Sequence, residues 1–312
     1  MVDRRVSTPT PEVFVIVGPT ASGKTALAIE AAERLGGPSA VEIINADSMQ
    51  VYTGMDIGTA KLPMAERRGI VHHLFDVWPV THPVTVAEYQ TLAREKIASI
   101  HARGRRAMLV GGSGLYITAT IDDLRFPGTD PQVRTRLENE LDDVGPIVLY
   151  QRLRERDPAA AERIPQTNGR RIVRALEVIE ITGLPFSATL PKQPGEIVPT
   201  VQIGVDWPNE TLYERIETRV EHMWEQGFVD EVRGLRVQLE ASRTAKRALG
   251  YQQVLAFLRG EVSEDQARKD TVVATRRFAR RQRSWFSRDR RISWLDGADQ
   301  RLTESAMDII DP

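Results

Sequence analysis

The segment Gly18–Thr25 constrains this chain more than any other feature of the sequence. It reads G-P-T-A-S-G-K-T and fits the phosphate-loop pattern G-x4-G-K-[ST]. An apolar, β-branched run at 13–17 enters the loop, and a helix-forming run at 26–30 leaves it. Because the pattern forms a binding site only between a strand and a helix, this context predicts a polyphosphate site rather than a chance glycine turn.

Each part of this loop has an expected chemical role. Backbone N–H groups of the loop and of the following helix N-terminus would cradle a di- or triphosphate. Lys24 would reach the terminal phosphates, and the Thr25 hydroxyl would ligate Mg2+. The expected phosphate contacts are Gly18, Pro19, Thr20, Ala21, Ser22, Gly23, Lys24 and Thr25. The loop alone does not specify which polyphosphate binds or what happens to it.

Composition excludes several other classes of protein. The 312 residues include no cysteine, so disulfides and thiolate metal sites are excluded. No apolar run approaches the length of a membrane span, and the polar N-terminus lacks the apolar segment of a secretory signal. We therefore expect a cytoplasmic protein. His72 and His73 do not predict a metal site, because adjacent residues point to different sides of a strand or helix.

Strand and helix patterns alternate along the first third of the chain. Short strands are predicted at 41–44 and 107–110, with a helix at 86–102 between them, which indicates a parallel sheet covered on both faces. The alternation stops near 127–131, and the text to about 199 is helical. A strand returns at 201–205, and the remainder again looks helical. We predict an α/β fold like that of phosphate-loop NTPases.

Two domains follow from this pattern. Residues 1–124 and 201–312 would form the α/β core with its C-terminal helices. Residues 125–200 would form a helical insertion, in which the stretch 170–181 has apolar residues at helical spacing and ends at Gly183 and Pro185.

Asp47 is the candidate general base. Motor-type NTPases carry an acid after a later apolar strand, but here that strand leads into glycines at 111–114. The acid instead ends the second strand. Since the carboxyl ends of parallel strands face the ligand crevice, Asp47 should face the phosphate loop and could take a proton from an incoming nucleophile. The alternative is a turn former or helix N-cap.

Arg215 and Arg219 lie one turn apart on a predicted helix at 210–226. An apolar stripe runs beside them, so the pair could clamp a pyrophosphate leaving group. Acids at Glu214, Glu217 and Glu221 intervene, and a solvated charged face fits the pattern equally well.

Arginines crowd the stretch 276–291, where Asp289 is the only acid. Arg276, Arg280 and Arg283 share one face of a predicted helix. Another face carries Ala274, Phe278 and Trp285. This arrangement predicts core packing on the second face and nucleic-acid backbone contacts on the first, against the alternative of a solvated surface.

Several motifs together resemble one family. The loop at 18–25 is followed in order by D-S-M-Q-V-Y, G-M-D-I-G-T-A-K, H-H-L, G-G-S-G-L-Y, R-A-L-E-V and G-Y-Q. These motifs stand at 47–52, 54–61, 72–74, 111–116, 174–178 and 250–252. The combination resembles the tRNA dimethylallyltransferases, also called tRNA isopentenyltransferases, of bacterial type. This sequence departs from the family pattern at two positions. Leu62 stands between Lys61 and Pro63, where the family often has proline directly after the lysine. Ser113 stands where threonine is common.

The resemblance implies a prenyl transfer. The loop would bind dimethylallyl diphosphate with Mg2+, and the dimethylallyl group would pass to N6 of adenosine 37 in tRNA, giving N6-(dimethylallyl)adenosine and diphosphate. Asp47 would be the general base, with Lys24 and Thr25 in the catalytic site. Either Arg219 or Arg215 would contact the diphosphate. We expect a monomer whose partner is the tRNA anticodon stem-loop.

The resemblance also implies a set of tRNA contacts, and the insertion would bind the anticodon stem. The residues are Asp47, Ser48, Met49, Gln50, Ser113, Arg134, Arg170, Arg171, Arg174, Lys246, Arg247, Gly250, Tyr251 and Gln252, joined by Arg276, Arg280 and Arg283.

Three other functions compete with this one. An adenylate dimethylallyltransferase acting on free AMP, ADP or ATP would need neither the insertion nor the arginine patch. A small-molecule kinase with Asp47 as base would not need the motifs at 54–61 and 250–252. A non-catalytic RNA-binding protein would not need Lys24, Thr25 and Asp47 together.

Overall fold

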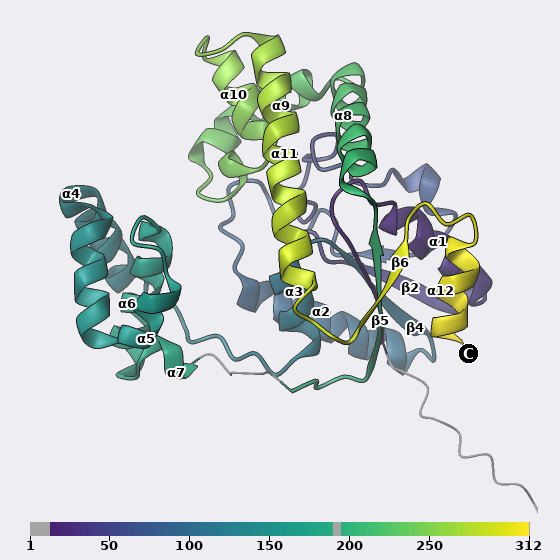
Figure 1. The fold of residues 1–312 in the computed structure, drawn as a ribbon, viewed down its shortest axis with the longest axis horizontal. Coiled ribbons are helices and arrows are strands. Elements are labelled where there is room, and N and C mark those ends of the chain that lie inside the picture. Colours follow the sequence, from purple (N-terminus) through teal and green to yellow (C-terminus); the bar gives the residue numbers. More distant parts are fainter. Residues whose placement is uncertain (1–12, 190–194, 312) are drawn as a thin grey trace, which may run out of the picture. The chain divides into compact units, whose positions relative to one another are not determined.

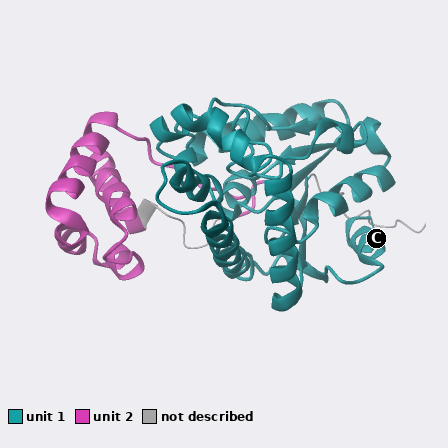
Figure 2. Cartoon of the chain, turned by 90° about the horizontal axis from the view of Figure 1, so that it is seen from above, with its two compact units in different colours: residues 1–121, 198–312 teal, residues 122–197 magenta. Residues whose placement is uncertain are grey.

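A computed structural model describes residues 13–189 and 195–311. These residues form two compact units (Figure 2). Among the described residues, the core unit comprises 13–121 and 198–311, and the insertion unit comprises 122–189 and 195–197. The division falls within a few residues of the limits expected from the sequence, 125–200.

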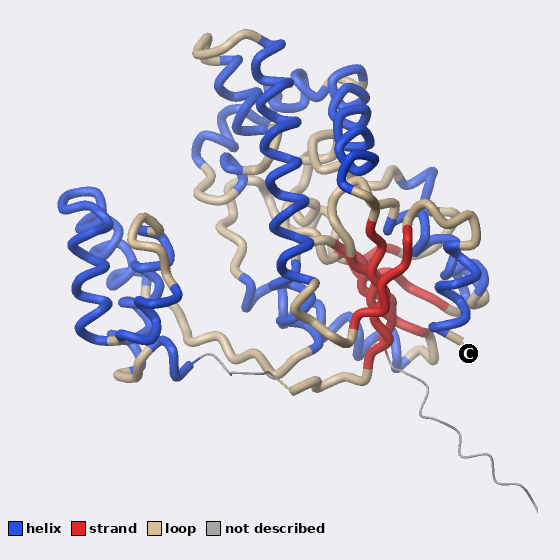
Figure 3. The backbone as a smooth tube through the Cα atoms, viewed as in Figure 1, coloured by secondary structure: helices blue, strands red, loops and turns tan. Residues whose placement is uncertain are grey.

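The core unit contains a six-stranded parallel sheet, drawn in red in Figure 3. Its order is β3-β2-β4-β1-β5-β6, so β1 lies near the centre. The bounds are β1 Val13–Val17, β2 Val41–Asn45, β3 His72–His73, β4 Arg106–Gly111, β5 Thr200–Asp206 and β6 Ile292–Asp296. Every described pair of neighbouring strands is parallel, which confirms the predicted α/β class.

The strand β6 was not predicted, because the stretch after 205 looked entirely helical. The prediction failed because β6 lies at the edge of the sheet. Only Ile292 in this strand is buried, and the other side chains are partly or fully exposed. An edge strand with one buried residue lacks the apolar run or strict alternation that would identify it.

Helices cover both faces of the sheet, and β1 shows why. Val13 and Val15 belong to one apolar cluster, whereas Phe14 and Ile16 belong to another. Successive strand residues point to opposite faces, so both sides of β1 must be buried. The first face packs against α2 and α3, and the second against α1 and α12 (Figure 1). Their bounds are α1 Lys24–Arg34, α2 Val86–Ala102, α3 Gly114–Ile121 and α12 Leu302–Ile310.

The described part of the core unit has four further helices: α8 Asn209–Glu225, α9 Phe228–Ala241, α10 Tyr251–Leu258 and α11 Glu264–Phe286. Short 3-10 turns lie at η1 Gly37–Ser39, η2 Met64–Arg67 and η3 Ala245–Arg247.

The predicted core face of α11 was wrong. Trp285 is 42% exposed, and the buried positions are Ala267, Thr271, Ala279, Gln282 and Phe286. Small and polar side chains make up most of this face, and the glycines at 112 and 114 leave space for the Gln282 and Trp285 side chains that reach from α11. A pattern search for large apolar residues misses such a face.

The insertion unit is helical, as predicted. It consists of α4 Pro131–Arg156, α5 Pro158–Arg163, α6 Gly169–Thr182 and α7 Phe186–Thr189. A kink at Gly145 divides α4. The expected apolar spacing of α6 is confirmed by buried Ile172, Val173 and Leu176, and the helix ends at Gly183 in the left-handed conformation.

Glu231 on α9 joins two motifs that are far apart in the sequence. Its carboxylate accepts the backbone N–H groups of Asp56, Ile57 and Gly58 at 3.0, 2.6 and 3.1 Å. It also accepts the Tyr251 hydroxyl at 2.5 Å. The loop at 54–61 and the start of α10 are therefore a single packed assembly. Tyr251 is fully buried, and burial, followed by the charge of Glu231, raises its pKa well above the usual value.

We predict that Glu231→Ala lowers the free energy of unfolding by about 2–4 kcal/mol, because three backbone donors lose a charged acceptor. Urea unfolding followed by circular dichroism measures the change. The control is Glu240→Ala on the same helix, which removes only an exposed ion pair with Arg236 and should cost below about 1 kcal/mol. Equal losses in the two variants would contradict this role of Glu231.

Candidate active site at the phosphate loop

The phosphate loop follows β1 and enters α1, as the motif predicted. Gly18 and Gly23 have φ angles of +156° and +91°. A Cβ on Gly18 would lie 2.5 Å from the carbonyl oxygen of Val205, so the neighbouring strand leaves no space for a side chain there. No side chain caps the N-terminus of α1. Its first-turn N–H groups therefore remain available to an anion.

The carbonyl groups of the loop, in contrast, are used by the protein. Trp207 Nε1 donates to the Ser22 oxygen at 2.8 Å, and Arg215 Nε donates to the Ala21 oxygen at 2.9 Å. The Arg215 guanidinium also lies 4.2 Å from the centre of the Trp207 ring. This support orients the loop with its acceptors facing the protein.

Asp47 follows β2 in a tightly bonded turn. Asn45 is buried, accepts the Asp47 N–H at 3.0 Å and donates to the Leu74 oxygen at 3.1 Å. Asp47 Oδ1 accepts the Met49 N–H at 2.8 Å. This oxygen therefore acts as a turn former, which was the alternative to a general base. Within the described part of the chain, Oδ2 accepts no hydrogen bond from the protein. One oxygen thus orients the carboxylate, and the other is available.

Asp47, Lys24 and Arg219 interact electrostatically. Burial and, after it, the positive charge of Arg219 lower the pKa of Lys24 to about 8, while the charge of Asp47 acts in the opposite direction. Burial likewise lowers the pKa of Arg219, and Asp47 opposes that shift. The structure therefore brings one carboxylate and two cations together at the phosphate loop.

The two candidate arginines have different surroundings. Arg219 is half-buried, interacts with Lys24 and Asp47, and points a guanidinium nitrogen at the Thr59 oxygen at 3.4 Å. Arg215 is exposed and donates to the Ala21 oxygen of the loop. Arg219 is thus the better placed of the two to contact a bound diphosphate.

The loop after β4 is linked to the Asp47 turn. Ser113 Oγ accepts the Ser48 N–H at 2.9 Å. Gln282, which sequence analysis missed, joins this second loop to the first: its side chain accepts the Thr20 N–H and donates to the Gly112 oxygen, each at 2.9 Å. A glutamine within an arginine-rich run gives no sequence signal for such a role.

The structure divides the predicted tRNA contacts into accessible and engaged groups. The exposed side chains are Arg170, Arg171, Lys246, Arg247, Gln252 and Arg280, while Ser48, Met49, Gln50 and Ser113 are half-buried. Gly250 is buried.

The engaged arginines are held by the protein itself. Arg134 and Arg174 both pair with fully buried Glu177, and Arg174 also donates to the Pro127 oxygen at 2.6 Å. Arg276 pairs with Glu217 at 2.8 Å.

Two positions need correction. Arg283 is bonded to Asp206, the Trp207 oxygen and Asn209, so it fastens α11 to the end of β5 rather than presenting a free cation. Tyr251 is fully buried, so its side chain packs the core and offers no surface for RNA.

The loop residues fit a Mg2+ ion bound together with a phosphate ligand. The Thr25 side chain is exposed, and the buried Ser22 hydroxyl has no hydrogen-bond partner.

Across residues 13–189 and 195–311, no group of three or more His, Cys, Asp or Glu side chains could hold a metal. His73 bonds Glu42 at 2.5 Å and His72 bonds the Ile70 oxygen at 2.8 Å.

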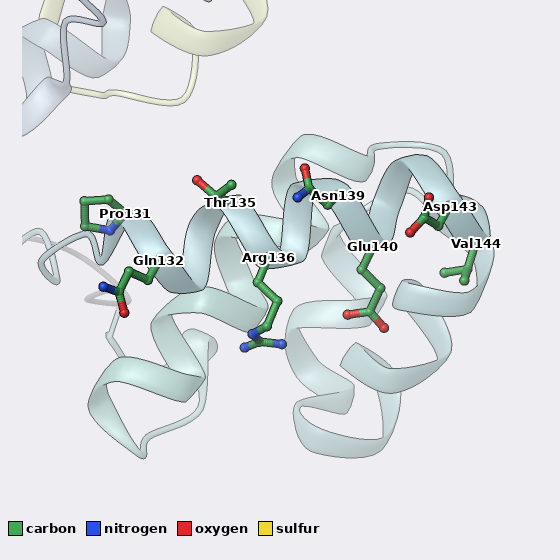
Figure 4. Close-up of a pocket in the computed structure, with 8 residues that line it drawn as sticks. All are labelled: Pro131, Gln132, Thr135, Arg136, Asn139, Glu140, Asp143 and Val144. Carbon is green, nitrogen blue, oxygen red and sulfur yellow. The ribbon is translucent and has the colours of Figure 1, made fainter.

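A hollow of about 810 Å3 lies along α4 in the insertion unit (Figure 4). Its labelled residues are Pro131, Gln132, Thr135, Arg136, Asn139, Glu140, Asp143 and Val144. All come from one helix, and Arg136 and Glu140 are paired with Glu180 and Arg152. The hollow therefore lacks a convergent set of free reactive groups.

None of the described helices is long and apolar enough to cross a membrane.

Comparisons with known proteins agree with this site. The model of the IPP transferase family matches residues 50–289. The tRNA dimethylallyltransferase of Streptomyces avermitilis is 59% identical over 297 residues, covering 95% of this chain and 94% of that protein. The enzyme of the same name from Salinispora arenicola is 58% identical, covering 95% and 85%.

Solved structures show the same similarity. The tRNA isopentenylpyrophosphate transferase of Bacillus halodurans superimposes with a TM-score of 0.70 at 37% identity, covering 96% of this chain and 95% of that one. A eukaryotic dimethylallyltransferase described as acting on tRNA gives a TM-score of 0.77 at 27% identity, covering 95% and 77%. The chain belongs to the IPP transferase family.

Proposed function

We propose that this protein transfers the dimethylallyl group of dimethylallyl diphosphate to N6 of adenosine 37 in tRNA. The products are N6-(dimethylallyl)adenosine and diphosphate. One observation carries the proposal: a carboxylate with a free oxygen, Asp47, meets the cations Lys24 and Arg219 at a phosphate loop. The names of the relatives supply the donor and the acceptor.

The cations and the loop would act on the leaving group. Breaking the bond between the allylic carbon and the diphosphate oxygen leaves negative charge on the diphosphate. Lys24, Arg219 and the uncapped N–H groups of α1 would stabilise that charge as it develops. Mg2+ held by the Thr25 hydroxyl and the phosphate oxygens would neutralise part of the same charge.

Asp47 would act on the acceptor. As the bond between N6 and the allylic carbon forms, the amine loses a proton, and Oδ2 of Asp47 would receive it. The Met49 N–H holds Oδ1 and so fixes the direction of Oδ2. An adenine in an anticodon loop is partly stacked, so the base must leave the stack to reach this carboxylate.

The tRNA would bind through basic residues on both units. Exposed Arg280 lies on α11, and exposed Lys246 and Arg247 lie in η3. Arg170 and Arg171 begin α6 of the insertion unit, where they would contact the backbone of the anticodon stem. We also propose that the protein works as a monomer in the cytoplasm.

An assay with three acceptors tests this function. Labelled dimethylallyl diphosphate and Mg2+ are supplied with an unmodified tRNA, with the same tRNA carrying guanosine at position 37, or with AMP. The proposal expects label in the first acceptor alone. Label in AMP would indicate an adenylate dimethylallyltransferase, and consumption of ATP without label would indicate a kinase.

We predict that Asp47→Asn lowers kcat by about 100- to 10,000-fold, because an amide cannot accept the proton. Single-turnover transfer measures the loss, and binding of the anticodon stem-loop should stay near the wild-type value. The matched control is Asp308→Asn, at an exposed position of α12. A variant at Asp47 that turns over at the wild-type rate would exclude this aspartate as the base.

The surroundings of the two arginines predict different losses. Arg219→Ala should lower kcat/KM by about 10- to 150-fold, as expected for losing a charged hydrogen bond. Arg215→Ala removes only a brace on the loop and should cost less. Steady-state kinetics with varied dimethylallyl diphosphate measures both, and a larger loss at Arg215 would reverse the assignment.

The pKa of Lys24 predicts a pH dependence. Below pH 8 the amine is charged, so affinity for inorganic pyrophosphate with Mg2+ should fall as the pH rises through about 8. Titration calorimetry from about pH 7 to about pH 9 measures it. In Lys24→Arg the cation persists, and this component should vanish. Arg219→Ala should move it to higher pH, since Arg219 lowers the pKa of Lys24. Identical profiles in wild type and Lys24→Arg would contradict the prediction.

A further inference from the structure

Gln282 is a buried polar side chain between two loops of the site. It is 5% exposed, near the C-terminal end of α11. Its Oε1 accepts the Thr20 N–H and its Nε2 donates to the Gly112 oxygen, each at 2.9 Å. A Cβ on Gly112 would lie 2.2 Å from Nε2, so the glycine makes space for this bond. One amide therefore ties the phosphate loop to the loop after β4.

The next residue, Arg283, connects α11 to the opposite side of the phosphate loop. Its Nε donates to Asp206 at 2.7 Å, and its guanidinium also donates to the Trp207 oxygen. Trp207 in turn donates to the Ser22 oxygen at 2.8 Å. The last turns of α11 thus support the loop directly through Gln282 and indirectly through Arg283.

The link continues to the acceptor side of the site. The residue after Gly112 is Ser113, whose hydroxyl accepts the Ser48 N–H next to Asp47. A displacement of α11 near Gln282 would therefore change the hydrogen bonding of both the phosphate loop and the turn that carries the base.

The same helix presents cations to solvent within two turns of Gln282. Arg277, Arg280 and Arg281 are exposed, and Arg277 and Arg280 make no described ion pair. Such residues attract an RNA backbone. RNA bound there would restrain the helix that positions the phosphate loop.

We propose that Gln282 is a positioning residue that couples RNA binding on α11 to diphosphate binding in the phosphate loop. The inference rests on the proposed function. RNA bound on α11 raises the affinity for diphosphate, and by thermodynamic linkage diphosphate then raises the affinity for RNA by the same factor. Gln282 itself touches neither ligand; it acts through Thr20 and Gly112.

The test measures affinity for inorganic pyrophosphate with Mg2+, alone and with a saturating unmodified anticodon stem-loop. In the wild type, RNA should raise this affinity about 10-fold, within the usual range of coupling energies. Gln282→Met keeps the length of the side chain without its hydrogen bonds, and the increase should fall below about twofold. The control is Gln266→Met, the same substitution at the exposed start of α11, which should keep the full increase.

A loss of folding is separated from a loss of coupling by a second variant. Gln282→Glu keeps an acceptor for Thr20 but cannot donate to Gly112 as a carboxylate, so its coupling should also be lost while RNA alone still binds. Full coupling in either variant at Gln282, or none in the wild type, would overturn the inference. Failure of the wild type to prenylate tRNA would instead overturn the proposed function.

Discussion

The structure depends on how the phosphate loop divides its own backbone groups. A loop that binds an anion must direct N–H groups at the ligand, so its carbonyl oxygens need partners elsewhere. Here those partners are side chains: Lys24 at 3.3 Å from the Pro19 oxygen, Arg215 on Ala21 and Trp207 on Ser22. These partners come from α1, α8 and the end of β5. The geometry of the loop therefore depends on how these elements pack around the sheet.

The acceptor side of the site is built on the same principle. The Asn45 side-chain amide hydrogen-bonds the backbone of Asp47 and Leu74, and these bonds fix the turn after β2. The glycines after β4 allow α11 to approach, and Ser113 connects that loop to Ser48. Arg219 lies where the two sides meet, close to Lys24 and Asp47. The turn after β2 and the loop after β4 lie at one edge of the sheet because the carboxyl ends of parallel strands coincide there, and α8 adds Arg219.

Sequence reasoning found what local patterns encode. The phosphate loop, the parallel sheet, the helical insertion and the candidate base at Asp47 all follow from residues close together in the chain. It missed features created by tertiary contacts. The edge strand β6 buries only Ile292, and the buried face of α11 includes Gln282 in a run of arginines, where polarity suggests solvent.

Sequence analysis identifies two motifs but does not predict that they pack together. The stretch at 54–61 and the residues Gly250 and Tyr251 resembled a family pattern, and Tyr251 was assigned to tRNA. The structure shows that Glu231 bonds both segments, and Gly58 has no side chain because a Cβ would lie 2.1 Å from Phe228. Long-range packing of this kind leaves no periodicity in a single sequence.

The most direct measurement is a crystal structure of the complex with an anticodon stem-loop and an unreactive thio analogue of dimethylallyl diphosphate. The account predicts that the diphosphate lies on the phosphate loop against Lys24 and Arg219. It predicts adenosine 37 outside the base stack, with N6 about 3 Å from Oδ2 of Asp47. An adenine that binds away from Asp47, or a diphosphate held by Arg215 without Arg219, would contradict it.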